Sequence, residues 1–269
     1  MARTVVIAEI GENHAGDWDR ARQMVVAAAR AGADIVKFQS YRGIDVAVDD
    51  PEKDWFTRVQ LPDDLHVELF ELARQQGVEF LSSPFTVERA RFLHERLGLK
   101  SFKIASSELL NWPLLDYMNH LGETVYLSTG MATLEEVKVA VGRLSRVPRV
   151  VIMHCVTQYP LRDEDANLRA IQVLQGAFPS HPIGYSDHTI GVLAPLAAVA
   201  LGCAVVEKHF TMDKSLPGTD HVLSVTPEEL REMVHQIRQV EKLLGTARKE
   251  PTPGELAIRD LVRSRFSRE

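Results

Sequence analysis

Eight short apolar runs rich in β-branched residues alternate with amphipathic helical patterns along this 269-residue chain. Such runs are typical of strands that are buried on both faces, as in parallel sheets covered by helices. The expected strands are 4–10, 35–39, 79–83, 101–106, 124–129, 150–155, 182–186 and 204–210. The clearest expected helices are 18–31, 63–76, 87–97, 134–145 and 192–201. Eight such units in about 250 residues predict a (β/α)₈ TIM barrel.

A doubly wound α/β sheet is the alternative architecture for this alternation. It usually needs fewer strands at this length, and no Gly-x-Gly-x-x-Gly turn follows the first apolar run. The end of the chain is rich in Pro and Arg, which does not fit a further strand–helix unit. We therefore expect a catalytic barrel over residues 1–249 and a tail or linker over residues 250–269.

Charge and cysteine content narrow the class of protein. The formal net charge of −6 argues against a nucleic-acid or membrane-surface partner, so an anionic ligand needs a local cluster of cations. Cys155 and Cys203 are the only cysteines, and both fit buried thiols in a reducing compartment. No apolar run is long enough to span a membrane, and an expected strand begins too early to leave room for a signal peptide. We expect a cytoplasmic protein.

Polar or charged residues close every expected strand. Residues two apart on a strand share a face, and the carboxyl ends of parallel strands meet at one rim of a barrel. Lys208 has the opposite parity to its neighbours and is expected to face the helices. The residues expected at one pocket are Glu9, Lys37, Gln39, Ser83, Lys103, Ser106, Ser128, His154, Ser186, His188, Glu207 and His209.

The chemistry of these side chains is coherent. Ammonium and hydroxyl groups would form a phosphate cradle from Lys37, Lys103, Ser83, Ser106 and Ser128. His188 and His209, at the ends of neighbouring strands, would bind a divalent metal, with water or substrate filling the remaining positions. Glu9 and Glu207 are carboxylates that could act as general base or join the metal shell.

Each of these residues also has a purely structural interpretation. A single strand-end lysine is usually solvated or ion-paired, and a serine after a strand is often a helix N-cap. His154 could be a hydrogen-bonded core histidine, and Glu9 could be the structural partner of a lysine. What favours a catalytic site is that all of them occur at the same end of eight strands.

Nine segments, in order from Val5 to about Leu244, resemble motifs of the sialic acid synthases, the bacterial N-acetylneuraminate synthases. They are 7–16 (IAEIGENHAG), 36–39 (VKFQ), 82–85 (SSPF), 103–108 (KIASSE), 127–131 (LSTGM), 154–160 (HCVTQYP), 184–189 (GYSDHT), 207–211 (EKHFT) and 217–220 (PGTD). The order and number of these segments make the resemblance specific, which no single motif would be.

The resemblance implies a metal-assisted, aldol-type condensation of phosphoenolpyruvate (PEP) with an open-chain aldose, N-acetylmannosamine or a related sugar, giving a nonulosonic acid and phosphate. It places Mn²⁺ or Mg²⁺ on His188 and His209. It assigns PEP to Lys37, Ser83, Lys103, Ser106, Ser128 and Ser186. It assigns the sugar to Gln39, Glu108, Tyr159, Glu207 and Asp220.

For this reaction we expect Glu9, Lys103 and Glu207 to be catalytic. Glu9 would orient or deprotonate the water that adds to C2 of PEP. Lys103, together with Lys37, would offset the charge on the departing phosphate.

Two features depart from the family pattern. Thr157 stands where the family usually has an asparagine that contacts the sugar. The chain stops at Glu269, about where a C-terminal antifreeze-like domain usually begins. That domain is exchanged between subunits in the family, so a homodimer remains a possibility here.

Two other functions stay open at this point. One is a PEP-condensing synthase of the octulosonate or heptulosonate type, which takes phosphorylated sugars and would need a second phosphate site. Arg162 is the only Lys or Arg within 156–167, which favours an unphosphorylated acceptor. The other is a non-catalytic binding or scaffold barrel.

Overall fold

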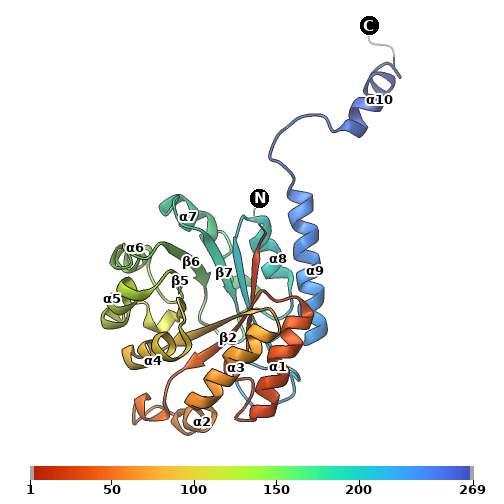
Figure 1. Ribbon diagram of the computed structural model, residues 1–269. Coiled ribbons are helices and arrows are strands. Elements are labelled where there is room, and N and C mark those ends of the chain that lie inside the picture. Colours follow the sequence, from red (N-terminus) through yellow and green to blue (C-terminus); the bar gives the residue numbers. More distant parts are fainter. Residues whose placement is uncertain (1–2, 267–269) are drawn as a thin grey trace.

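Eight parallel strands form a nearly closed barrel in the computed structural model, which describes residues 3–266 (Figure 1). The strands are β1 (Val5–Glu9), β2 (Ile35–Ser40), β3 (Glu79–Pro84), β4 (Ser101–Ile104), β5 (Thr124–Ser128), β6 (Arg149–Cys155), β7 (Ile183–Asp187) and β8 (Val205–His209). The hydrogen-bonded order runs β3-β2-β1-β8-β7-β6-β5-β4, and β3 and β4 lie side by side. This confirms the TIM barrel. The doubly wound sheet is wrong, because β1 pairs with β8 as well as with β2.

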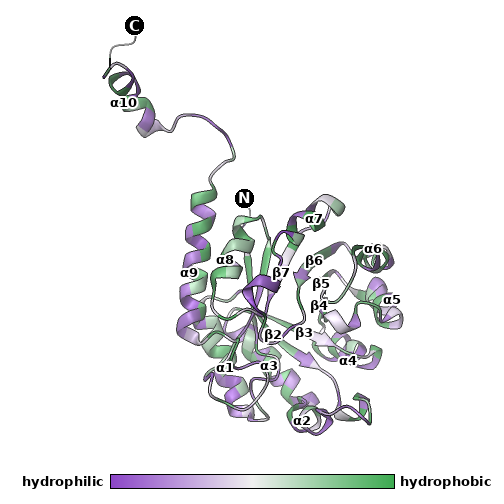
Figure 2. Ribbon diagram, turned by 180° about the vertical axis from the view of Figure 1, so that it is seen from behind, coloured by the Kyte–Doolittle hydropathy of each residue, from purple (hydrophilic) through white to green (hydrophobic). Residues whose placement is uncertain are grey.

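Helices surround the barrel, except for the last one, which stands apart from it. The helices are α1 (Trp18–Ala31), α2 (Lys53–Val59), α3 (Asp63–Gln75), α4 (Val87–Leu97), α5 (Trp112–Leu121), α6 (Leu134–Arg143), α7 (Ala170–Ala177), α8 (Leu193–Ala200), α9 (Pro227–Leu244) and α10 (Pro253–Arg263). Helix α8 is apolar on all sides, because it packs between the barrel and α9; in Figure 2 it is mainly green, whereas α9 alternates between green and purple.

Strand side chains alternate between two cores. The inner core fills the barrel and consists of Ile7, Ile35, Leu81, Tyr126, Val151, Met153 and Val205. The outer core packs strands against helices, with Val6 and Phe38 as buried examples. An eight-stranded barrel is just wide enough for its interior to be filled by side chains. Polar side chains on the inner face can therefore gather only where this filling ends, at the carboxyl rim.

The parity of β6 corrects one prediction. Met153 and Cys155 share the inner face, whereas His154 points toward the helices. His154 Nε2 lies 2.9 Å from the carbonyl oxygen of Ala166, and its ring stacks on Tyr185 with centroids 5.7 Å apart. Placing His154 in the pocket was wrong, because an apolar run buried on both faces does not reveal which parity faces inward.

Lys208 faces the helices, as its parity predicted. Its Nζ lies 2.6 Å from Asp187 Oδ2, and both side chains are fully buried. Lys208 also donates to the carbonyl oxygen of Thr189. Asp187 ends β7 and Lys208 lies in β8, so this buried pair joins the two strands. Asp187 directly precedes His188, and Lys208 directly precedes His209.

The chain leaves the barrel after α9. Residues 245–252 lead to α10, whose start is fixed by a capping box between Thr252 and Glu255. Helix α10 stands apart on the side where the chain begins, which is the side of the strands' amino ends (Figure 1). A helix thus lies within the segment expected to be a tail or linker, and residues 267–269 of that segment lie outside the described residues. Within residues 3–266, no helix combines the length and the apolar character that crossing a membrane requires.

Candidate active site

A pocket of about 550 Å³ opens at the carboxyl ends of the strands. It brings together nearly all of the residues expected from the sequence. Those that line it are Glu9, Lys37, Gln39, Ser83, Lys103, Ser106, Ser128, Tyr159, Ser186, His188, Glu207, His209 and Asp220. Glu108 is not among them: its Oε2 accepts a hydrogen bond from Asn111 Nδ2 at 2.7 Å, at the start of α5.

Two lysines and two glutamates form the floor of this pocket. Lys37 Nζ lies 2.7 Å from Glu9 Oε2 and 3.8 Å from Glu207 Oε1. Lys103 Nζ lies 3.4 Å from the same oxygen of Glu207. None of the four side chains is more than 4% exposed. Buried charges are tolerated when they are paired, so the floor is electrically balanced within the protein.

Strand register explains why these four groups meet. Glu9 of β1 is the direct neighbour of Lys37 in β2 and of His209 in β8. Glu207 lies two residues before His209, on the same face of β8. The pairing of β1 with β2 and with β8 therefore fixes which of these residues are neighbours, whatever rotamers their side chains adopt.

The two glutamates differ strongly in acidity. Burial raises the pKa of Glu9 to about 7, against the opposing effect of Lys37. Burial acts in the same direction on Glu207, but Lys103 and Lys37 outweigh it and lower the pKa to about 2. Paired carboxyl groups with separated pKa values are typical of acid–base sites. Near neutral pH, Glu207 stays ionised while Glu9 exchanges a proton.

The lysines respond to the same surroundings. Burial lowers the pKa of Lys103, although Glu207 opposes this effect. Burial would also lower the pKa of Lys37, but Glu207 and Glu9 together outweigh it and raise the pKa. Lys37 is therefore the more firmly protonated of the two lysines.

Serine hydroxyls surround this charged floor. Ser128 Oγ accepts a hydrogen bond from Lys103 Nζ at 2.6 Å, and Ser83 Oγ lies 3.3 Å from Lys37 Nζ. Ser186 Oγ donates to Glu207 Oε1 at 2.9 Å. The structure thus assembles a ring of hydroxyl and ammonium groups, the arrangement that an anion of several charges requires.

Gly130 allows a close approach at the edge of this ring. Its backbone N–H donates to Ser106 Oγ at 3.0 Å. A Cβ atom at this position would lie 2.2 Å from Thr157 Oγ1 and 2.7 Å from Ser106 Oγ. A side chain here would therefore displace two residues that line the pocket.

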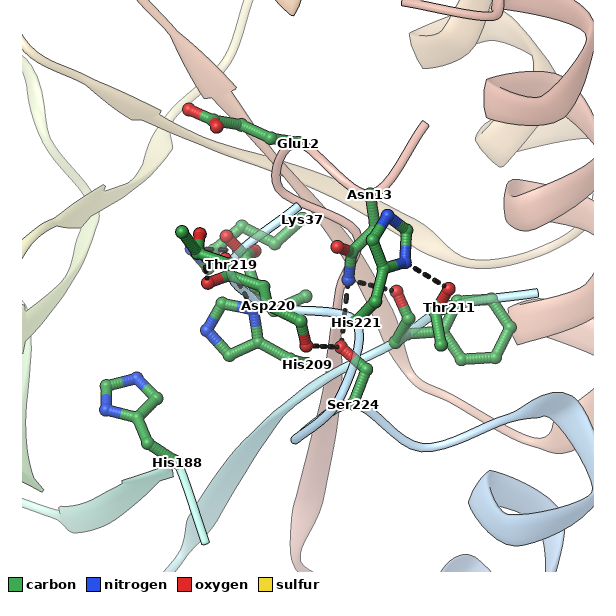
Figure 3. Close-up of polar contacts among 12 residues, drawn as sticks. Glu12, Asn13, Lys37, His188, His209, Thr211, Thr219, Asp220, His221 and Ser224 are labelled. Carbon is green, nitrogen blue, oxygen red and sulfur yellow. Dashed lines mark hydrogen bonds and ion pairs between the residues drawn. The ribbon is translucent and has the colours of Figure 1, made fainter. Parts of the chain in front are cut away.

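The two histidines lie together beside the floor. The ring centroids of His188 and His209 are 5.3 Å apart, and the Tyr159 ring lies 4.1 Å from that of His188. His188 Nδ1 is 2.7 Å from the carbonyl oxygen of Val156, so when Nδ1 carries the proton the lone pair is on Nε2. His209 Nδ1 lies 3.3 Å from Asp220 Oδ2 (Figure 3).

Local interactions move the pKa values of the two histidines apart. Burial, reinforced by His188 and Lys37, lowers the pKa of His209 well below its ordinary value. Burial also acts to lower the pKa of His188, but the Cys155 thiol and the Val156 carbonyl outweigh it, and the pKa is raised. His209 is thus neutral at physiological pH and has the protonation state that metal ligation requires.

These donors fit a divalent metal held by two imidazoles. His209 Nδ1 is buried and makes no hydrogen bond within residues 3–266. Over the same part of the chain, no three His, Cys, Asp or Glu side chains are gathered as metal ligands. The protein could supply His188 and His209, and water or substrate oxygens would supply the remaining positions. The metal site stays a prediction.

Loop residues complete the outer part of the pocket. Glu12, in the turn after β1, accepts hydrogen bonds from Trp55 Nε1 at 2.6 Å and Tyr41 Oη at 2.9 Å. Burial raises the pKa of Glu12 to about 7, against these two bonds. Further lining residues that sequence reasoning did not assign to the pocket are Glu52, Phe56, Phe85, Ser107, Met131, Cys155, Gln158 and Thr219. All of these except Glu52 and Phe56, and Glu12 as well, lie within the motifs that resemble the family, so the motifs were the signal that could have found them.

Cys155 was expected to be a buried structural thiol. It is buried, but it also lines the pocket, with its Sγ 3.9 Å from His188 Nδ1. Thr157 likewise lines the pocket, close to Ser106 and Gly130.

Comparison with known proteins identifies the family of this chain. The model of the NeuB family matches residues 24–249. N,N'-diacetyllegionaminic acid synthase from Legionella pneumophila is 40% identical over 279 residues, covering 96% of this chain and 78% of that protein. N-acetylneuraminate-9-phosphate synthase from Homo sapiens is 36% identical over 270 residues, covering 95% of this chain and 75% of that protein.

A solved structure extends the similarity to three dimensions. The crystal structure of N-acetylneuraminic acid (sialic acid) synthetase from Leptospira borgpetersenii, in complex with citrate, matches with a TM-score of 0.92 and 34% identity, covering 98% of this chain and 92% of that one. The chain belongs to the NeuB family and is an enzyme of this family of synthases. This confirms the resemblance inferred from the motifs.

The two histidines give a direct test of the metal site. We expect His188→Ala and His209→Ala each to weaken Mn²⁺ binding by at least about tenfold and to abolish metal-dependent turnover, because each removes one of only two imidazoles. Calorimetric titration with Mn²⁺ measures the first effect, and circular dichroism checks that the barrel stays folded. His154→Gln, which alters an imidazole outside the pocket, is the matched control. Unchanged Mn²⁺ affinity in both alanine variants would contradict the assignment.

Proposed function

We propose that this protein condenses PEP with the open-chain form of an unphosphorylated amino sugar, giving a nonulosonic acid and phosphate. The observation that carries the proposal is the buried floor of Lys37, Lys103, Glu9 and Glu207, ringed by serine hydroxyls and flanked by two histidines. The named synthases among its relatives support a reaction of this class.

PEP fits the floor of the pocket by charge and by hydrogen bonding. Its phosphate and carboxylate would lie against Lys37 and Lys103, with hydroxyl donors from Ser83, Ser106, Ser128 and Ser186. The glutamates that now pair with the lysines hold the ammonium groups in place for the incoming anion.

The reaction requires C3 of PEP to form a bond to the aldehyde carbon and a water to add at C2, after which the tetrahedral intermediate expels phosphate. Glu9 is suited to orient this water and accept its proton, because its pKa of about 7 lets it exchange a proton near neutral pH. Glu207 remains ionised and can stabilise positive charge that develops at C2. Lys103 and Lys37 offset the negative charge of the leaving phosphate.

We include Mn²⁺ or Mg²⁺ on His188 and His209 in this proposal. When bound there, a divalent metal supplies Lewis acidity toward the aldehyde oxygen of the acceptor. The protein's own part is to hold two imidazoles 5.3 Å apart, with Asp220 beside one of them and Tyr159 beside the other.

The outer pocket favours an acceptor without phosphate. Lys37 and Lys103 are the only Lys or Arg side chains that line it within the described residues, and both are engaged at the floor. The carboxylates lining it are Glu9, Glu12, Glu52, Glu207 and Asp220. A second phosphate would therefore meet carboxylates without a Lys or Arg side chain of its own to compensate its charge. The charges that line the pocket therefore favour an unphosphorylated sugar as acceptor over the phosphorylated sugars used by octulosonate- or heptulosonate-type synthases.

Phosphate release from PEP tests the proposal. The protein is incubated with PEP and Mn²⁺ together with N-acetylmannosamine, other acetamido aldoses, or N-acetylmannosamine 6-phosphate. We expect release with at least one unphosphorylated aldose and little with the 6-phosphate. If PEP binds but no aldose triggers release, the proposed condensation is overturned and a binding role for this barrel is favoured. Release with the 6-phosphate alone would overturn the acceptor class.

The proton held by Glu9 predicts a pH dependence. Because burial raises its pKa to about 7, the carboxylate form is lost as pH falls below 7, so kcat/KM for PEP should fall about tenfold per pH unit there. Glu9→Gln should lower kcat by about 10²- to 10⁴-fold and remove this limb of the profile. Glu12→Gln is the matched control, since Glu12 has a similar pKa but makes its bonds to Tyr41 and Trp55. A limb that survives in Glu9→Gln and disappears in Glu12→Gln would contradict the role of Glu9.

A further inference from the structure

Residues 210–226 form the loop between β8 and α9, and this loop brings Asp220 beside His209 (Figure 3). The backbone closes this loop at its base. Thr211 N–H donates to the carbonyl oxygen of Val225 at 3.0 Å, and Val225 N–H donates to that of His209 at 2.8 Å. Within the loop, Ser224 N–H also donates to the carbonyl oxygen of Asp220 at 3.1 Å. Side-chain contacts add to this single backbone bond at Asp220.

Asn13 supplies such contacts from the turn after β1, the strand that pairs with β8. Its Nδ2 lies 2.9 Å from the carbonyl oxygen of Phe210 and 2.9 Å from Ser224 Oγ. Ser224 Oγ in turn donates to the carbonyl oxygen of Asp220 at 2.6 Å. Since the hydroxyl hydrogen is used on Asp220, Ser224 Oγ must accept from Asn13, and both hydrogens of the Asn13 amide are used.

This chain of hydrogen bonds is buried but does not reach the pocket. Asn13 is 2% exposed and Ser224 is 1% exposed, and neither lines the cavity. The hydrogen bonds nevertheless end at the main chain of two residues near the pocket, Phe210, which directly follows His209, and Asp220. Asn13 thus links the end of β8, next to His209, to the main chain of Asp220.

A second tether acts on the neighbour of Asp220. His221 Nδ1 lies 2.8 Å from Thr211 Oγ1, at the start of the same loop. The His221 ring packs against Gly218, where a Cβ atom would lie 3.0 Å from His221 Cδ2. The main-chain carbonyl of Asp220 and the side chain of the next residue, His221, are therefore both held by hydrogen bonds. The Asp220 carboxylate faces His209 and Thr219.

We propose that Asn13 and Ser224 are positioning residues for acceptor binding: they hold Asp220 beside His209 in the orientation that binds the sugar. This inference rests on the proposed function. A long surface loop loses much conformational entropy when one orientation is imposed on it, and buried hydrogen bonds offset that loss. The Ser224 hydroxyl bonds directly to Asp220, whereas Asn13 reaches Asp220 through Ser224 and also bonds to the strand end that carries His209.

Steady-state kinetics of Ser224→Ala, with a saturating second substrate, tests the inference. We expect KM for the aldose to rise about tenfold while KM for PEP changes less than about twofold, because PEP binds at the floor away from the loop. Asn13→Ala should raise KM for the aldose and also lower kcat. Ser215→Ala is the matched control, since Ser215 belongs to the same loop but bonds to Asp213 at the surface.

A double-mutant cycle separates positioning from general loosening. In an Asp220→Ala background, Ser224→Ala should raise KM for the aldose no further, because its effect passes through Asp220. Full additivity of the two substitutions, or an equal rise in both KM values for Ser224→Ala, would overturn the inference.

Hydrogen exchange provides a measurement that does not depend on turnover. Amides of residues 219–224 should exchange faster in Ser224→Ala than in the wild type or in Ser215→Ala. If the wild type releases no phosphate with any aldose, the proposed function fails, and this measurement then decides the present inference. Unchanged protection in Ser224→Ala would overturn it.

Discussion

The pocket depends on four charges buried on the inner face of the barrel. Lys37, Lys103, Glu9 and Glu207 come from four strands, and none of them would be tolerated there alone. Together they are neutral, and each lysine is held by a carboxylate and a serine hydroxyl. An anionic substrate therefore meets donors that are already oriented, so little reorganisation is needed when negative charge moves during the reaction.

The rest of the barrel keeps this arrangement in register. The β1–β2 and β1–β8 ladders set Glu9 beside Lys37 and His209. Behind the pocket, the buried pair of Asp187 and Lys208 joins β7 to β8, the strands that lead into the two histidines. At the rim, Asn13 ties the loop carrying Asp220 to the end of β8. The buried charges of the floor and the hydrogen bonds around the pocket therefore hold the carboxyl ends of the same few strands in place.

Much of this could be predicted from the sequence, because parallel strands place polar residues of equal parity at one rim. The strands and the five clearest helices lie within two residues of their expected bounds, and the lysines, serines and histidines meet as expected. His154 was misplaced because an apolar run does not show which face is inward. Glu108, which was assigned by resemblance, does not line the pocket, and its side chain accepts a hydrogen bond from Asn111, the N-cap of α5. Glu12 lies in the turn after β1, and Trp55 lies in α2, within the long connection between β2 and β3. The positions of such connecting segments depend on tertiary contacts that no periodicity reveals.

The most direct test of this account is the affinity of the protein for PEP alone, measured by calorimetry in the wild type, Lys37→Met and Lys103→Met. If the buried floor is the PEP site, each substitution should weaken PEP binding by at least about tenfold, since each removes a charge-assisted hydrogen bond and leaves a glutamate facing the anion. The pocket-lining but uncharged Gln39→Ala should bind PEP nearly as well as the wild type. PEP affinity that is unchanged in both lysine variants would contradict the central claim.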